Sequence, residues 1–172
     1  MKATGSSGEL VPIEECYISI DGATIKMKVL PDISDSKSAS YNDEPIIGRS
    51  FPMKTYSHSE NRTISWTAHF IVCKKADIEQ NIKDLYLIAG CVYPEEGEPY
   101  SPPPICQIKC GKLLAEDELC VVLRSYSVKF PTEVAWDEET MVPYKFDVDM
   151  TWEVVYSTEE LPNAGDIFSS GG

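Results

Sequence analysis

Alternation of apolar and polar residues runs through much of the chain and predicts β-strands. The clearest case is the segment 144–156, where seven apolar residues alternate with polar ones, as expected when successive side chains point to opposite faces of a sheet. Segment 62–73 alternates in the same way. The runs 13–20 and 24–30 flank Asp21-Gly22, a dipeptide that favours the tight turn of a β-hairpin.

One segment, 77–89, has the spacing of an α-helix instead. Its apolar residues recur at helical intervals, Asp77 is expected to cap its beginning, and Gly90 is expected to end it. Residues 105–109 predict a short strand after the proline-rich loop 94–104. The polar residues 31–48 predict a long irregular excursion, a kind of loop that is usually functional or interfacial.

Segment 119–130 predicts a long strand that is apolar on both faces. One face carries Leu119, Val121 and Leu123, and the other carries Val122, Tyr126, Val128 and Phe130. Such a strand is central in a core or lies at a subunit interface. One small domain cannot easily bury a second apolar face by itself. Contact with further copies in a closed, symmetric assembly would bury it.

These elements predict a mainly β fold with two packed antiparallel sheets, as a sandwich or open barrel, and one flanking α-helix. We expect one domain over residues 13–157, between a flexible N-terminal segment, 1–12, and a flexible C-terminal tail, 158–172.

Composition argues against several classes of function. The 172 residues include 28 Asp and Glu against 15 Lys and Arg, a net charge of −13, which argues against binding to nucleic-acid phosphates. No apolar run approaches the length of a membrane span, so no membrane insertion is expected. The start of the chain lacks the apolar region of a signal peptide, so the cysteines are expected to begin reduced in a cytoplasm.

No motif predicts catalysis or a bound cofactor. The nucleophile-elbow, phosphate-loop and zinc-protease patterns are missing from the sequence, and acidic clusters fall in predicted turns. Cys106 and Cys110 are spaced too loosely for a zinc pair and lack a second pair of ligands. We therefore expect no enzyme, no cofactor and no metal site. Pairing among the six cysteines stays open.

Several weak motifs occur together in one order. The segment 31–70 contains Ser36, Ser38 and Tyr41, then Pro45, Gly48 and Arg49, then the run Arg-Thr-Ile-Ser-Trp at 62–66. Farther on come the helix, a Tyr-Pro and triple-proline loop, a strand ending Ser-Tyr-Ser-Val, an acidic loop, and a strand ending Trp-Glu-Val. In this pattern the chain resembles the tube-domain proteins at the baseplate end of contractile tails, namely tail-tube initiators of myophages and related baseplate proteins of contractile injection systems.

The resemblance implies a structural virion protein that assembles in the host cytoplasm. It would form a homo-hexameric ring whose sheets join into a continuous inner barrel. The ring would connect the central hub or spike to the tail tube, contact other baseplate proteins, and nucleate growth of the tube.

In that frame, specific residues acquire expected roles. The subunit interface is expected at Tyr41, Arg49, Val122, Tyr126 and Val128. The acidic residues Asp147, Asp149 and Glu153 are expected to face the lumen, where their charge would let DNA pass without specific binding. The segment 31–61 would reach along a neighbouring subunit or ring.

A second hypothesis belongs to another class of function. The chain would then be a carbohydrate- or receptor-binding β-sandwich module of a tail, with Tyr56, Tyr93 and Tyr100 as a sugar-stacking platform.

Overall fold

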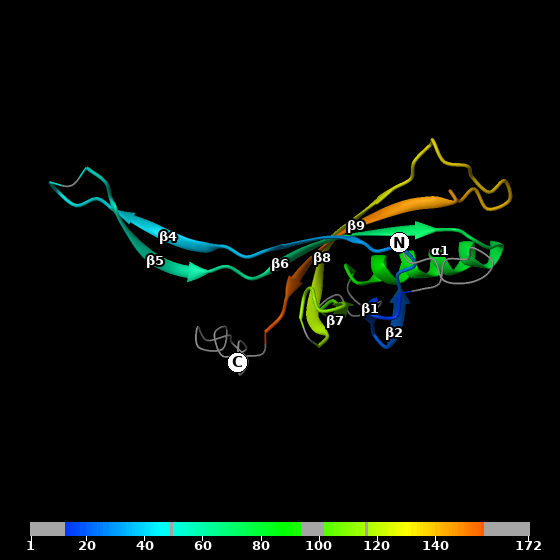
Figure 1. Cartoon of the computed structure of the whole chain (residues 1–172), viewed down its shortest axis with the longest axis horizontal. Coiled ribbons are helices and arrows are strands. Elements are labelled where there is room, and N and C mark those ends of the chain that lie inside the picture. Colours follow the sequence, from blue (N-terminus) through cyan, green and yellow to red (C-terminus); the bar gives the residue numbers. More distant parts are fainter. Residues whose placement is uncertain (1–12, 49, 94–101, 116, 157–172) are drawn as a thin grey trace.

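The computed structural model describes residues 13–48, 50–93, 102–115 and 117–156. Within these residues the chain forms nine strands and one helix (Figure 1). In chain order they are β1 (Cys16–Ile20), β2 (Ala23–Lys26), β3 (Asp32–Ser36), β4 (Ala39–Glu44), β5 (Met53–Ser59), β6 (Thr63–Ile71), α1 (Lys75–Gly90), β7 (Cys106–Cys110), β8 (Leu119–Lys129) and β9 (Lys145–Val154). The predicted fold class is confirmed: the described part of the chain is mainly β, with two antiparallel sheets and a single helix. The predicted flexible ends, 1–12 and 158–172, lie outside the described residues.

The larger sheet has seven strands in the order β2-β1-β7-β8-β9-β6-β3. Figure 1 shows that it bends strongly, so that β1 and β2 lie below β6 and β9, with α1 alongside. An ion pair of 2.7 Å between Lys28, just after β2, and Asp77 of α1 ties the β2 edge to the helix. The bend and α1 therefore cover the apolar face of the large sheet, and the two-stranded sheet takes no part in covering it.

The core follows the predicted alternation. Inward-facing residues of β6 and β9 are fully or almost fully buried, and two tryptophans, Trp66 and Trp152, are the largest of them. Across the two strands Trp66 lies opposite Met150, and Ile64 lies opposite Trp152. The rings of Phe70 and Phe146 stack with centroids 5.1 Å apart. Burial of these side chains gives the main favourable free energy of folding.

The Asp-Gly turn has the expected geometry. Asp21 and Gly22 both have positive φ, 47° and 83°, as a two-residue type I′ turn requires. The hairpin of β1 and β2 closes on the pair Ile20 and Ala23, which confirms the predicted hairpin, with shorter strands than expected.

Helix α1 begins two residues before the predicted range. Asp77 caps it from the third helical position, where its carboxylate accepts the backbone N–H groups of Cys73 and Lys74 at 2.9 Å each. A carboxylate in the first turn also complements the positive end of the helix dipole. No helix in the described part of the chain is long and apolar enough to cross a membrane.

The prediction of an irregular excursion over 31–48 is wrong. Residues Asp32–Ser36 form β3, which pairs with β6, and Ala39–Glu44 form β4, which pairs with β5. The Ser- and Asp-rich composition hides these strands because both are mostly exposed and therefore lack the apolar alternation of a half-buried strand. Their pairing partners lie many residues later in the chain.

The interpretation of 119–130 as apolar on both faces is also wrong. The pairing of β8 with β9 shifts between Leu123 and Ser125, and this β-bulge adds one residue that reverses the order of inward and outward side chains. Tyr126 then lies opposite buried Met150. The residues before and after the bulge consequently share one apolar face.

Candidate assembly surfaces

The most exposed part of the described chain is the hairpin of β4, β5 and their connection, residues 39–48 and 50–59, which we call the arm. Figure 1 shows that it extends far from the body, away from α1. It continues the β3–β6 hairpin, because the backbone N–H of Glu60 donates to the carbonyl of Ser38 at 2.9 Å.

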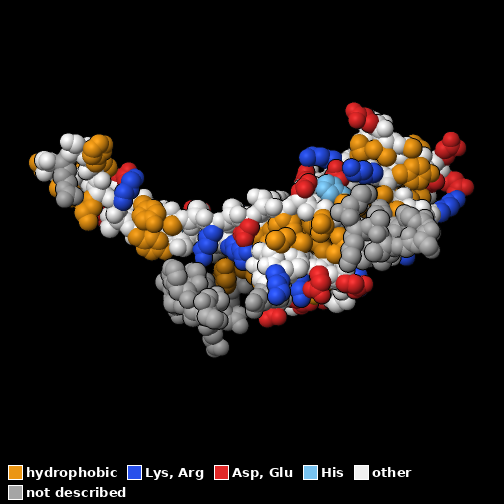
Figure 2. All heavy atoms as spheres, viewed as in Figure 1, with side chains coloured by type: hydrophobic (Ala, Val, Ile, Leu, Met, Phe, Trp, Pro, Cys, Tyr) orange, Lys and Arg blue, Asp and Glu red, His pale blue; other side chains and the backbone are white. Residues whose placement is uncertain are grey.

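The arm carries an unusual number of exposed apolar side chains. They are Tyr41, Ile46, Ile47, Phe51, Met53 and Tyr56. Phe51 is 82% exposed and Ile47 is fully exposed. Figure 2 shows this apolar surface along the arm. Tyr41 and Tyr56 contact each other edge to face, with centroids 5.9 Å apart, and no arm residue belongs to the buried core of the described chain.

The base of the arm is fixed by Arg62. Its guanidinium donates to both carboxylate oxygens of Asp35 on β3, at 2.9 Å and 3.0 Å from Nε, and to the carbonyl of Leu114 at 2.9 Å. The hydrogen bond from Arg62 is the main cause that lowers the pKa of Asp35. Arg62 thus links the arm's origin to the connection between β7 and β8.

Two strands of the large sheet have an open edge. β2 and β3 are the terminal strands of its order, so the outer backbone groups of each have no strand partner within the described residues. Open edges of this kind are sites where a second chain can add a strand.

The acidic residues of β9 lie on the polar face of the sheet, opposite the core. Asp147 is 2.6 Å from Nδ1 of His69, and Asp149 accepts hydrogen bonds from Thr67 at 2.7 Å and is paired with Lys129 at 2.8 Å. These contacts partly balance the negative charge of the face.

The third acidic residue of β9 is paired as well. Glu153 accepts a hydrogen bond from Asn61 at 2.6 Å and is also paired with Arg124. The hydrogen bonds from Asn61 and Arg124 lower the pKa of Glu153.

Of the five predicted interface residues, the four that the structure describes lie on different surfaces. Tyr41 is exposed on the arm, and Arg49 lies outside the described residues. Val122 lies opposite Glu153 on the polar face, whereas Tyr126 and Val128 pack against the core. Tyr126 and Val128 are thus part of the core face and not of a second apolar face, and their place in an interface stays a prediction. Sequence reasoning missed Ile47 and Phe51, whose only signal was an apolar residue within a polar stretch.

Two of the three tyrosines expected to form a sugar platform lie on separate elements. Tyr56 is on β5 of the arm, and Tyr93 follows α1. Both are exposed, and the ring of Tyr56 contacts Tyr41. Tyr100 lies outside the described residues.

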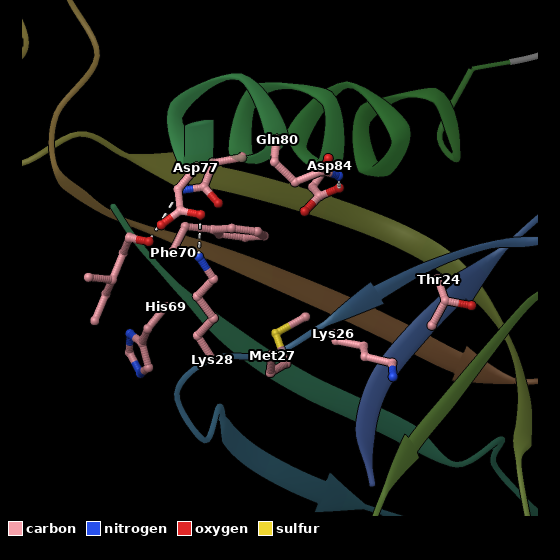
Figure 3. A pocket seen from close by; sticks show the side chains of 11 residues that line it. Thr24, Lys26, Met27, Lys28, His69, Phe70, Asp77, Gln80 and Asp84 are labelled. Carbon is pink, nitrogen blue, oxygen red and sulfur yellow. Dashed lines mark hydrogen bonds and ion pairs between the residues drawn. The ribbon is translucent and has the colours of Figure 1, made fainter. Parts of the chain in front are cut away.

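A cavity of about 270 Å³ lies between β2, β6 and α1 (Figure 3). Asp84 of α1 is almost buried there and accepts a hydrogen bond from Gln80 at 2.8 Å. Burial raises the pKa of Asp84. On the same side of the helix Asp77 forms an ion pair with Lys28, and this pair joins the helix to the β2 edge.

An apolar hollow lies between α1 and the connection from β8 to β9. Its lining residues are Ile82, Leu85, Tyr86, Phe130, Trp136, Thr140, Met141, Val142, Pro143 and Phe146. Tyr86 and Met141 are at least 70% exposed. This hollow is a second apolar surface, on the body and distant from the arm.

No family model and no curated protein matches the chain. The chain is similar to chains in two solved structures, the virion of a native gene transfer agent particle and the tail of an empty particle of that kind with C6 symmetry. In each case the identity is 12%, the match covers 84% of this chain and 93% of that chain, and the TM-score is 0.39. We draw no conclusion about function from a similarity of this extent.

Proposed function

We propose that the chain is a structural, non-catalytic protein of a contractile tail. Six copies would form a ring at the baseplate, which joins the hub or spike to the tail tube and nucleates growth of the tube. The single observation that carries this proposal is the exposed apolar arm. The assignment to a contractile tail comes from the sequence resemblance.

In a monomer the arm would be only marginally stable and would expose apolar side chains to water. A two-stranded hairpin without an apolar face against a core is marginally stable in water at best, and exposed apolar residues in a contiguous patch mark interaction sites. Contact with a second protein would remove Ile47 and Phe51 from water and stabilise the hairpin. The arm is therefore best explained as a device that reaches another subunit.

The apolar hollow beside α1 is the surface on the body that would receive the arm of a neighbouring copy. The arm and the hollow are different surfaces, so contact between them is heterologous, and heterologous contacts close into rings when the rotation between copies is right. The open edge of β3 in one copy and of β2 in the next would then extend the sheet from subunit to subunit. In this arrangement the edges are covered, which removes their tendency to aggregate.

The polar face of β9 would line the lumen of such a ring. Asp147, Asp149 and Glu153 would supply its carboxylates, of which Asp149 and Glu153 are paired with Lys129 and Arg124. Carboxylates repel phosphate, so DNA would pass without specific binding. Expected partners are further copies of the chain, the tube protein, and the hub and other baseplate proteins.

Native mass spectrometry and negative-stain electron microscopy of the full chain test the proposal. We expect six-membered rings, alone or after addition of the tube protein. The double variant Ile47→Ser and Phe51→Ser is expected to stay monomeric while its circular dichroism spectrum is unchanged. Leu113→Ser is the matched control, because Leu113 is also highly exposed, at 76%, but lies off the arm.

Two results would overturn the proposal. One is a ring that forms equally well with the double arm variant, which would show that the arm is not the contact. The other is a chain that stays monomeric under all conditions and binds glycans on an array, which would favour the carbohydrate-binding hypothesis.

A further inference from the structure

Four of the six cysteines lie in two buried pairs. The sulfur atoms of Cys16 and Cys110 are 3.6 Å apart, and those of Cys91 and Cys106 are 3.7 Å apart. All four side chains are buried, and they are thiols in this structure. A disulfide has a sulfur–sulfur distance of about 2.05 Å, so each pair needs only a small rotation of its side chains to reach it.

The backbone already has suitable geometry at the first pair. Cys16 on β1 lies directly opposite Cys110 on β7. Opposed residues of antiparallel strands have Cα atoms about 4.5–5.5 Å apart, within the range of about 4.4–6.8 Å that disulfides span.

The second pair joins two different elements. Cys91 directly follows α1, and Cys106 is the first residue of β7. Their bond would close a loop of about 15 residues, which removes substantial freedom from the unfolded chain.

The pairs also explain the spacing of Cys106 and Cys110. Residues four apart on a strand point to the same face but lie about 13 Å apart, too far to bind one metal ion. Each has its own partner on another element. In the described part of the chain no three His, Cys, Asp or Glu side chains cluster closely enough to hold a metal.

We propose that the chain forms two disulfide bonds, Cys16–Cys110 and Cys91–Cys106, when it folds in the presence of a low-molecular-weight disulfide such as oxidised glutathione. In a reducing cytoplasm the four thiols persist. The inference does not rest on the proposed function, because it concerns the fold of a single chain.

The chemistry is thiol–disulfide exchange. One protein thiol loses its proton, and its sulfur attacks a sulfur of oxidised glutathione, which forms a mixed disulfide and releases one glutathione thiolate. The second protein thiolate then attacks the protein sulfur of the mixed disulfide and releases the other glutathione. For each pair, two protein thiols are oxidised to one disulfide and one oxidised glutathione is reduced to two thiols.

The timing of the reaction follows from burial. Burial and the hydrogen bond with Cys110 raise the pKa of Cys16, and the hydrogen bond with Cys91 together with burial raises the pKa of Cys106. The hydrogen bond with Cys106 lowers the pKa of Cys91, but all four side chains are buried and so are shielded from a dissolved disulfide. The folded and reduced chain is therefore expected to react slowly. The bonds should form while the chain folds, before the thiols are enclosed.

Refolding with a defined oxidant tests the pairing. The reduced, unfolded full chain is refolded in a mixture of reduced and oxidised glutathione, then denatured and treated with N-ethylmaleimide. We expect labelling only at Cys73 and Cys120, which are exposed, and peptides linked as Cys16–Cys110 and Cys91–Cys106 in the mass spectrum. Labelling at all six cysteines, or links between other partners, would overturn the proposal, and absence of one link would overturn it for that pair.

Thermal unfolding gives a second readout that does not depend on the mapping. For the wild-type chain, refolding in the oxidant is expected to raise Tm by roughly 6–12 °C for each bond formed, relative to the reduced chain. Cys106→Ala and Cys110→Ala should each lose one of these increments, whereas the matched control Cys120→Ala should keep both. Each Tm increment is the difference between oxidised and reduced samples of the same variant. The effect of the substitution on packing is present in both samples and therefore cancels. Equal increments in all three variants would contradict the assignment.

Discussion

At the scale of single residues, Arg62 is the side chain that fixes the base of the arm to the body. It contacts Asp35 with two nitrogens and also donates to the carbonyl of Leu114. Paired contacts of this kind hold the planar guanidinium in a defined orientation. Three segments that are distant in sequence therefore meet at one side chain, at the point where the arm leaves the sheet.

This contact gives the stability of the chain a specific dependence on pH. The pKa of Asp35 is lower in the folded chain than its unfolded value of about 3.9. Ionised Asp35 therefore stabilises the fold above about pH 4, and this contribution is lost as the pH falls through the lowered folded value. Because the pair is partly exposed, Asp35→Asn is expected to cost only about 0.5 kcal/mol at neutral pH, or about 1–2 °C in Tm.

Thermal unfolding between pH 7 and about pH 2 checks the expectation. The difference in Tm between the wild-type chain and Asp35→Asn should be largest at neutral pH and should vanish in acid. Glu14→Gln, which breaks a more exposed pair with Lys26, is the control and should change Tm less. A difference that grows toward low pH would contradict the interpretation.

At the scale of elements, the bulge in β8 determines which residues belong to the core. Val128 lies opposite buried Val148, whereas Val122 lies opposite Glu153 on the polar face. Val128→Thr places a hydroxyl against the core and is expected to destabilise the chain by about 1 kcal/mol. Val122→Thr should cost less than about 0.5 kcal/mol. Urea unfolding measures both, and equal costs would mean that the two valines share one environment.

The same bulge marks a limit of sequence-based prediction. The alternation correctly predicted β6 and β9, because each of these strands has one buried and one solvated face. In β8 the alternation changes phase at the bulge, and one inserted residue made a single apolar face look like two. Nothing in the local sequence distinguishes these cases, since the pairing with β9 decides the register.

The arm shows the complementary limit. Strands β3, β4 and β5 bury little and so lack a hydrophobic pattern, and their existence depends on pairing across the hairpin. Tyr41 was expected at the subunit interface and is exposed on the arm, whereas Ile47 and Phe51 were not named at all, because an isolated apolar residue in a polar stretch has no distinctive period.

A variant without the arm tests whether the arm is needed for assembly but not for folding. Replacing residues 38–61 with Asn-Gly joins β3 to β6 through a short hairpin turn and leaves the Asp35–Arg62 contact in place. Because no arm residue belongs to the described core, Tm is expected to change by less than about 4 °C, while rings are lost in sedimentation velocity. An unfolded product would show that the arm is part of the cooperative fold, and persistent rings would show that other surfaces suffice.

At the scale of the whole molecule, the charge of −13 opposes the approach of one copy to another. Repulsion between like-charged chains weakens as salt is added, because the Debye length shortens to about 8 Å at physiological ionic strength. We therefore expect ring formation to increase between about 0.02 M and about 0.3 M sodium chloride. This is the reverse of the behaviour of an assembly held by surface ion pairs.

Sedimentation velocity across this range of salt measures the effect. The double variant Ile47→Ser and Phe51→Ser is the control and should remain monomeric throughout, which excludes a general effect of salt on solubility. Dissociation of rings by salt would indicate that ion pairs, rather than the apolar arm, hold the copies together.

The position of β9 in the sheet has a consequence for how the chain is made. It is the last of the described strands in sequence, yet it lies between β8 and β6 and joins the half-sheet β2-β1-β7-β8 to the pair β6-β3. During synthesis it leaves the ribosome after every other described strand, so until then β8 and β6 both present open edges to other nascent chains. The large sheet is completed, and those edges are covered, only when β9 inserts between them.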